Sequence, residues 1–257
     1  MQQFFANTDR KPTNIIVDLY SSKPTKVRIR AIDPYKYGAI YIDRIATFNG
    51  EKSFEIRLPQ SPKKLLIKIM EVGQGANNSV QVVNMKQIEL PQYLPCLSEK
   101  KVLSFIKFAK EFCENAGILS VGRYQSDDKK YTIDYLPQIV HEGKTLTTPA
   151  RISNKNGRME ISQKAYKEMS IPMRMAIICH EFSHFYLNEI QKDEIEADLN
   201  ALTIYMGMGY PVIEAHKAFL ETFYKSPTES NKERYVYLKT FIDNFDTLKY
   251  DICSIKK

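Results

Sequence analysis

The sequence predicts a multidomain protein of mixed class: a β-sandwich over residues 1–93, followed by an α+β domain over residues 94–257 with a small sheet and several helices. Three observations predict this division. Short apolar or alternating segments repeat up to residue 90, separated by turn residues, as in all-β sandwiches. A stretch with two prolines, residues 91–95, then interrupts the pattern. Beyond it, apolar residues recur at helical spacing.

The strands expected in the first domain share a period-two or continuous apolar pattern, and they are residues 14–20, 26–30, 39–43, 53–57, 65–69 and 80–83. The separators are residues with strong turn preference, including Asp33-Pro34, Asn49-Gly50 and Pro59. Within residues 26–30, basic side chains alternate with valine and isoleucine. We therefore expect a sheet with one buried face and one face in water.

The second domain begins with a helix over residues 101–115, which Gly117 ends. Residues 118–124 and 131–135 predict a hairpin, and Asn156-Gly157 predicts a second hairpin turn before a strand at residues 159–162. After the motif region described next, helices are expected near residues 212–225 and 229–245.

The run His180-Glu181-Phe182-Ser183-His184 is the strongest functional signal in a chain with only four histidines. Residues 170–172, Ser-Ile-Pro, predict the start of the helix that carries it. At positions i and i+4, His180 and His184 lie on one face of that helix. Two imidazoles at this spacing bind one Zn²⁺ at about 2.0–2.1 Å. Glu181 then lies beside the metal, where a general base for a metal-activated water belongs.

A second helix is expected after Asp193, which forms a capping-box pattern with Glu196. Glu194 shares a face of this helix with Asp198, whereas Glu196 lies about 200° away from Glu194. The two glutamates therefore cannot both face one metal. We take Glu194 as the third ligand, because Asp198 on its side can hold the second nitrogen of a ligand histidine.

These residues resemble a known family. His180-Glu181-x-x-His184 followed by Glu194-x-x-x-Asp198 is similar to the pattern of the gluzincin metallopeptidases, and the short gap is closer to the small HtpX-like and ImmA/IrrE-like zincins. The resemblance covers roughly residues 150–215. It implies a zincin-like domain in which His180, His184 and Glu194 bind Zn²⁺, Glu181 is the catalytic base and Asp198 supports a ligand histidine. It also implies that an edge strand pairs with an extended peptide substrate.

The residue that stabilises the transition state in this family has no clear counterpart, and His216, Tyr210 and Tyr205 are the candidates. A simpler interpretation places the two histidines on a solvated helix face. The largely apolar composition of their helix opposes it, because a buried helix must satisfy such polar groups. A purely structural zinc is also less favoured, since structural sites usually have four protein ligands.

Composition narrows the class of protein. With 257 residues, 43% hydrophobic and 26% charged, the chain fits a soluble globular protein of one large or two modest domains. No signal peptide is visible, and no apolar run approaches the roughly 18–20 residues of a membrane span. The four cysteines are scattered, as in a reducing compartment. We therefore expect a cytoplasmic or virion protein with no membrane partner.

The net charge of +7 is uneven, because residues 1–95 carry 14 Lys/Arg and 8 Asp/Glu. An acidic partner surface is one explanation of this excess, and a solvated sheet face is the more favoured one. No nucleic-acid-binding motif accompanies it.

The sequence therefore predicts a zinc-dependent peptidase that hydrolyses peptide bonds in a protein or peptide substrate, with Glu181 as general base. The alternative is a structural component of a large assembly such as a phage virion. In that case residues 1–93 would contact other subunits, and the zincin-like domain would serve for docking or limited maturation cleavage. Peptidase activity that a chelator abolishes would favour the enzyme, and stable incorporation of an inactive protein into an assembly would favour the alternative.

Overall fold

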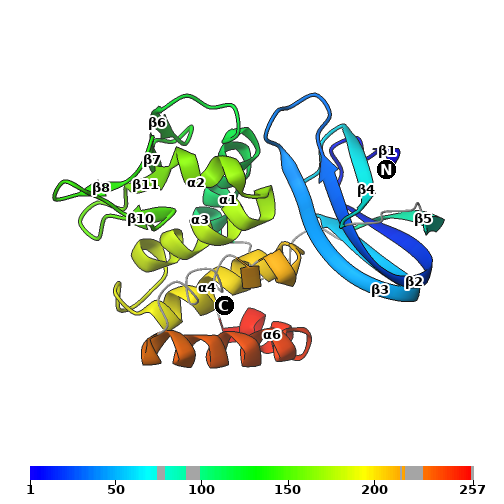
Figure 1. Cartoon of the computed structure of the whole chain (residues 1–257). Helices are drawn as coiled ribbons and strands as arrows, with labels where there is room; N and C mark the ends of the chain where they lie inside the picture. The colour runs from blue at the N-terminus through cyan, green and yellow to red at the C-terminus, as the bar shows by residue number, and fades with distance from the viewer. Residues whose placement is uncertain (74–78, 91–98, 215, 218–227, 256–257) are drawn as a thin grey trace. The chain divides into compact units, whose positions relative to one another are not determined.

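The chain forms two compact units, Met1–Gln92 and Tyr93–Lys257, in a computed structural model (Figure 1). The structure describes residues 1–73, 79–90, 99–214, 216–217 and 228–255, with side chains as far as residue 245. Strands make up the described part of the first unit, and the second combines helices with a small sheet. The expected mixed class, β and α+β, is confirmed.

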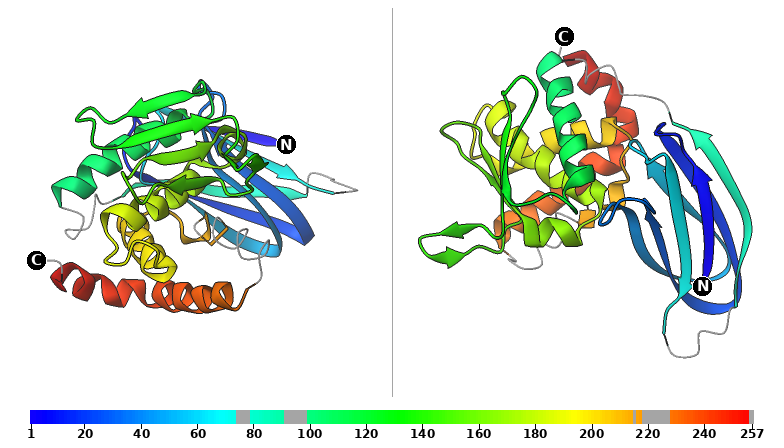
Figure 2. Two further views of the ribbon diagram at one scale, coloured as in Figure 1. Left: turned by 90° about the vertical axis from the view of Figure 1, so that its left-hand side faces the viewer. Right: turned by 90° about the horizontal axis from the view of Figure 1, so that it is seen from above.

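Five strands form the first unit. They are β1 (Gln2–Asn7), β2 (Thr13–Ile32), β3 (Ile40–Leu58), β4 (Lys64–Glu71) and β5 (Val80–Glu89). All belong to one antiparallel sheet in the order β1-β4-β2-β3, and β5 pairs with the first half of β2. The long strands β2 and β3 curve together along most of their length (Figures 1 and 2).

The turn expected at Asn49-Gly50 is wrong, because both residues lie inside β3. The expected strands on either side of it are parts of one strand, and the first two expected strands are likewise joined in β2. Pairing shifts between Ser21 and Thr25, where Gly50 on the opposite strand has a φ of 75°. The hydroxyls of Ser21 and Thr25 lie 2.8 Å apart and close this bulge, so the strands bend without leaving the sheet.

A sandwich of two facing sheets is not confirmed, since the described strands of this unit form a single sheet. The predicted alternation of buried and exposed residues is present in β2. Outside the bulge, the odd-numbered residues of β2 are buried, Val27 among them, whereas Lys26 is exposed and the Arg28 and Arg30 side chains are partly exposed. The Asp43 carboxylate lies 2.6 Å from Arg28 and 3.5 Å from Arg30. One acid on this face therefore balances part of its basic charge.

The second unit contains a small sheet, a short hairpin and a group of helices. Its elements are α1 (Lys100–Asn115), β6 (Gly122–Gln125), β7 (Thr132–Leu136), β8 (Val140–His141), β9 (Lys144–Thr145), β10 (Ala150–Ile152), β11 (Met159–Ser162), α2 (Gln163–Glu168), α3 (Ile171–Tyr186), α4 (Glu194–Gly207) and α6 (Glu229–Ile255). The sheet has the order β10-β11-β7-β6, with β11 and β7 parallel. β10 is therefore an edge strand of this sheet.

Both predicted hairpins of the second unit are confirmed: β6 pairs with β7, and β10 pairs with β11. The second turn contains Gly157, with a φ of 67°. A Cβ atom added there would lie 2.7 Å from Phe185 Cδ1 and from the Tyr186 hydroxyl. Only glycine fits this turn, which packs against the end of α3 and so fixes β10 close to that helix.

The helices α3 and α4 begin where their caps predict. Ser170 Oγ accepts a hydrogen bond from a backbone N–H in the first turn of α3. Asp193 Oδ1 accepts one from the N–H of Glu196 at 2.9 Å. The carboxylate of Glu196, however, accepts from the N–H of Glu189 at 3.0 Å rather than from Asp193. The expected capping box is thus half formed, and Glu196 instead ties down the loop between α3 and α4.

Aromatic packing holds α3 in the interior of the second unit. Phe182, in the middle of the histidine motif, stacks on Phe105 of α1 with ring centroids 3.7 Å apart. Tyr131 contacts both rings edge-on. α1 itself buries the apolar residues predicted from its spacing, namely Val102, Phe105, Ile106, Ala109 and Phe112. The motif helix is consequently part of the core and not a solvated surface helix.

The C-terminal helix α6 runs beside α4 and extends beyond the expected residue 245 (Figure 1). The helix expected near residues 212–225 falls partly outside the described residues. Among the helices that the structure describes, none is both long and apolar enough to cross a bilayer.

Arg174 of α3 is a fully buried cation, and burial lowers its pKa. Its Nε donates to the carbonyl of Tyr166 at 2.7 Å, and a terminal nitrogen donates to the carbonyl of Cys113 at 2.8 Å. These carbonyls belong to the last turns of α2 and α1, where a positive charge is favourable. Arg174 therefore joins three helices around the core.

We expect Arg174→Met to lower the free energy of unfolding by about 2–4 kcal/mol, because it removes these donors from two buried carbonyls. Urea denaturation followed by circular dichroism measures this. Arg123→Met is the matched control, since Arg123 pairs with Asp134 on the surface and its side chain is 58% exposed. It should leave the free energy of unfolding close to that of the wild type, because exposed ion pairs contribute little. Equal losses in the two variants would contradict the role given to Arg174.

Candidate metal centre

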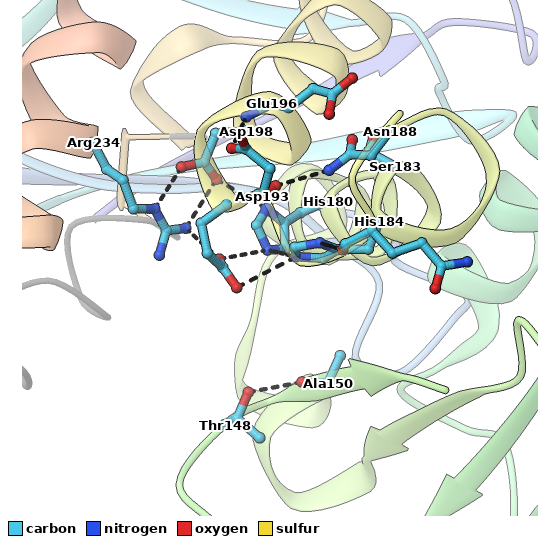
Figure 3. A network of polar contacts seen from close by, with 12 residues as sticks. Thr148, Ala150, His180, Ser183, His184, Asn188, Asp193, Glu196, Asp198 and Arg234 are labelled. Carbon is cyan, nitrogen blue, oxygen red and sulfur yellow. Dashed lines mark hydrogen bonds and ion pairs between the residues drawn. The ribbon is translucent and has the colours of Figure 1, made fainter. Parts of the chain in front are cut away.

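The two histidines of the motif meet on one face of α3, with their Nε2 atoms 3.0 Å apart (Figure 3). The imidazole planes are perpendicular to each other. Both side chains are nearly buried: that of His180 is 13% exposed and that of His184 is 10% exposed. One turn of helix thus directs two nitrogen atoms at the same point.

Glu194, in the first turn of α4, faces both rings. Its Oε2 lies 3.5 Å from His180 Nε2, and its Oε1 lies 3.6 Å from His184 Nε2. Ligand atoms of the three residues all lie within 4.8 Å of one another. Glu196 also belongs to α4, but its carboxylate accepts a hydrogen bond from the N–H of Glu189 in the α3–α4 loop. The structure therefore brings together the three predicted ligands and leaves Glu196 out.

Each imidazole is oriented through a contact of its other nitrogen. His184 Nδ1 donates to the carbonyl of Gln191 at 2.7 Å, and His180 Nδ1 lies 2.9 Å from the Asp198 carboxylate. A carbonyl and an ionised carboxylate only accept, so both Nδ1 atoms carry the proton. In the neutral rings, both Nε2 atoms then present lone pairs. Asp198 has the predicted position behind a ligand histidine.

This arrangement fits a metal ion. Two Nε2 lone pairs 3.0 Å apart repel each other unless a proton or a cation lies between them. Two imidazoles and one carboxylate form the usual three-ligand set of catalytic zinc, and partners that fix the tautomer are typical of ligand histidines. The residues present are therefore those that could hold a metal ion such as Zn²⁺.

The same contacts shift the pKa values of the two histidines in opposite directions. Burial lowers the pKa of His180, but the hydrogen bond and the charge of Asp198 outweigh it and raise this pKa above the usual value. Burial and the charge of His180 lower the pKa of His184. A metal ion held by both Nε2 atoms would compete with protons for them, so its affinity would depend on pH.

Glu181 lines the same cleft and comes from the same turn of α3 as His180. Burial raises the pKa of its carboxyl group to about 7, and the nearby charge of Glu194 acts in the same direction. The backbone N–H of Ile152 in β10 lies near this carboxyl group and acts to lower its pKa. A carboxyl group with a pKa near neutrality is suited to accept and return a proton.

A cleft of about 690 Å³ lies over these residues. One wall is the edge strand β10 with the residues just before it, and the other is the first two turns of α6. Figure 3 shows Thr148 and Ala150 across the cleft from the two histidines. The residues that line it besides the site residues include Arg151, Ile152, Asn154, Ile177, Lys192 and Asn231.

Arg234 of α6 is a residue of this site that the sequence analysis missed. It lines the cleft and contacts both Asp198 and Glu194. It is separated by 36 residues from Asp198 and lies on a helix with further cations such as Lys232 and Lys239. The helical pattern of the sequence gave no reason to choose Arg234 over these other basic residues.

The three candidates for a transition-state donor are not brought to the described cleft. The Tyr205 hydroxyl is buried and donates to the carbonyl of Pro211 at 2.9 Å, and the Tyr210 ring stacks on that of Tyr205. Neither these tyrosines nor His216 belongs to the lining that the structure describes. Of the described cations in the cleft, Arg234 is the one in contact with a ligand carboxylate.

Comparisons of the chain with protein-family models, with curated proteins and with solved structures found no match. The interpretation of the site consequently depends on its geometry and on the chemistry of its residues.

The choice of Glu194 over Glu196 gives a direct test. We expect Glu194→Gln to weaken Zn²⁺ binding by at least about 10-fold, because a neutral amide replaces an anionic ligand. Glu196→Gln is the matched control, since it changes the same charge on the same helix. Titration with a chelating zinc indicator gives both dissociation constants. Comparable losses in the two variants would contradict the ligand assignment.

Proposed function

We propose that this chain is a zinc-dependent peptidase of the gluzincin type. His180, His184 and Glu194 hold the metal, and Glu181 is the general base. The observation that carries the proposal is the convergence of both Nε2 atoms and the Glu194 carboxylate, with a proton-accepting carboxyl group in the same cleft. The motif Glu194-x-x-x-Asp198 supports it, because Asp198 orients a ligand ring.

The proposed reaction is hydrolysis of a peptide bond. When bound to His180, His184 and Glu194, zinc would supply Lewis acidity to polarise the scissile carbonyl and acidify a water molecule. Glu181 accepts the proton of that water and passes it to the leaving amine, so the protein ends each cycle in its starting protonation state.

The proposed substrate is an extended segment of protein or peptide. β10 is an edge strand, and its residues Ala150, Arg151 and Ile152 line the cleft. An extended chain can add to such an edge through backbone hydrogen bonds, which recognise shape rather than particular side chains. Its scissile bond would then lie beside Glu181, because Ile152 lies near that carboxyl group.

The decisive test is Glu181→Gln. We expect this variant to bind one Zn²⁺ per chain as the wild type does and to lose activity on a casein substrate by about 10²–10⁴-fold, the usual contribution of a general base. A chelator should abolish wild-type activity, and added Zn²⁺ should restore it. Full activity in the variant, or a purified wild type without zinc, would overturn the proposal.

A second candidate function is docking to other subunits of a large assembly, such as a virion, through residues 1–93. Exposed apolar side chains on the strands of the first unit favour it: Phe5 is 56%, Ile45 55% and Val83 60% exposed. These side chains are available for contact with a protein partner. Sedimentation of the isolated protein with its candidate assembly tests this, and Phe5→Ser together with Ile45→Ser should weaken incorporation.

A further inference from the structure

The C-terminal helix α6 forms part of the cleft although it lies far from the motif in sequence. Ser230, Asn231 and Arg234 line the cleft from its first two turns. Their spacing of one, three and four residues places them on one side of the helix. Further along, Leu238 and Phe245 are buried, and α6 contacts α4, the helix that supplies Glu194. The same helix therefore packs on the core and reaches the metal centre.

Arg234 is the residue that makes this connection. Its Nε lies 2.8 Å from Asp198 Oδ2, and one terminal nitrogen lies 3.1 Å from Asp198 Oδ1. The same terminal nitrogen lies 3.1 Å from Glu194 Oε2. The side chains of Arg234 and Asp198 are 10% and 1% exposed. One guanidinium therefore binds Asp198 in a bidentate manner and Glu194 at the same time.

The position of the Arg234 guanidinium relative to the histidines determines how it acts on the candidate metal site. Figure 3 shows Asp198 between Arg234 and His180, and the distances agree, with contacts of 2.8 Å on one side and 2.9 Å on the other. Glu194 Oε2 is likewise within reach of both Arg234 and His180. The two carboxylates are thus held from behind by Arg234 while they face the imidazoles.

We propose that Arg234 is a positioning residue that couples the docking of α6 to metal binding. It keeps Asp198 behind His180 and keeps Glu194, whose side chain is 48% exposed, from turning into solvent. This proposal rests on the metal centre of the proposed function but is independent of peptide hydrolysis.

We expect Arg234 to strengthen metal binding. A guanidinium near a divalent cation is repelled by it, which taken alone would weaken metal binding. Here the carboxylates of Asp198 and Glu194 lie between the guanidinium and the proposed metal site, and they reduce this repulsion. Groups that order the ligands in this way usually strengthen metal binding, and their loss costs about 10–100-fold in affinity. The metal in turn holds the carboxylates to which Arg234 binds, so metal and helix stabilise each other.

The first measurement is the Zn²⁺ affinity of the full-length chain, determined by competition with a chelator. Arg234→Gln should weaken binding by about 10–100-fold. Lys232→Gln is the matched control, because it removes the same charge from the same helix, but its side chain is 67% exposed and pairs with Glu229. It should bind Zn²⁺ as the wild type does. Equal affinity of Arg234→Gln and the wild type would overturn the proposal.

The second measurement reports on the helix itself. Tyr235 and Tyr237 of α6 are 38% and 49% exposed, and chymotrypsin cleaves after tyrosine where a helix opens locally. Zn²⁺ should slow cleavage of α6 several-fold in the wild type and in Lys232→Gln, and much less in Arg234→Gln. Cleavage of the wild type at the same rate with and without Zn²⁺ would also overturn the coupling.

A third variant covers the case in which Arg234→Gln does not fold, which circular dichroism would show. Arg234→Lys keeps the charge but cannot bind Asp198 in a bidentate manner and Glu194 together. It should give an intermediate affinity and intermediate protection by Zn²⁺, and wild-type values for both would reject the geometric role.

A wild type that binds no Zn²⁺ would reject the metal centre and the coupling together. An inactive wild type that binds Zn²⁺ would reject only the peptidase.

Discussion

The carboxylate of Asp198 is the group on which the arrangement of the candidate metal centre depends. It is almost completely buried, so its charge needs partners in the protein. It has two: the imidazole of His180 on one side and the guanidinium of Arg234 on the other. Burial alone would raise the pKa of Asp198, but these two partners outweigh burial and lower it. An ionised Asp198 fixes the tautomer of His180 and thereby directs its Nε2 atom toward His184 and Glu194.

The rest of the second unit holds this group of side chains in place. Phe182 anchors the middle of the motif helix on Phe105, and Arg174 satisfies the carbonyls at the ends of two helices that pack nearby. The turn at Gly157 packs against the end of α3, and Ile152 of the edge strand lies near Glu181. Rigid elements on all sides keep the donor atoms within the small distances that a metal site requires.

Polar groups in this core are therefore concentrated where chemistry is proposed. Glu181, Asp198 and the two histidines are buried or partly buried groups whose pKa values are all displaced from their usual values. Burying such a cluster costs stability, and displaced pKa values in a cleft are common at functional sites. The first unit differs from the second. One face of its sheet is polar and solvated, and some of its apolar side chains are exposed. Its strands supply no residue to the described lining of the cleft.

The sequence by itself determined the features that depend on neighbours within one helix or hairpin. The spacing of His180 and His184, the caps at Ser170 and Asp193, and the turn at Gly157 are all set by residues a few positions apart. The choice between Glu194 and Glu196 followed from the helical period, which separates the two glutamates, and from Asp198 on the same helix face as Glu194. The same local reasoning failed at Asn49-Gly50, where a turn signal was overridden by pairing with β2 across the sheet. Only the tertiary structure revealed Arg234, because its contact with Asp198 spans 36 residues and depends on how α6 packs against α4. Side-chain periodicity describes one element at a time, whereas a buried ion pair between two helices is decided by their packing.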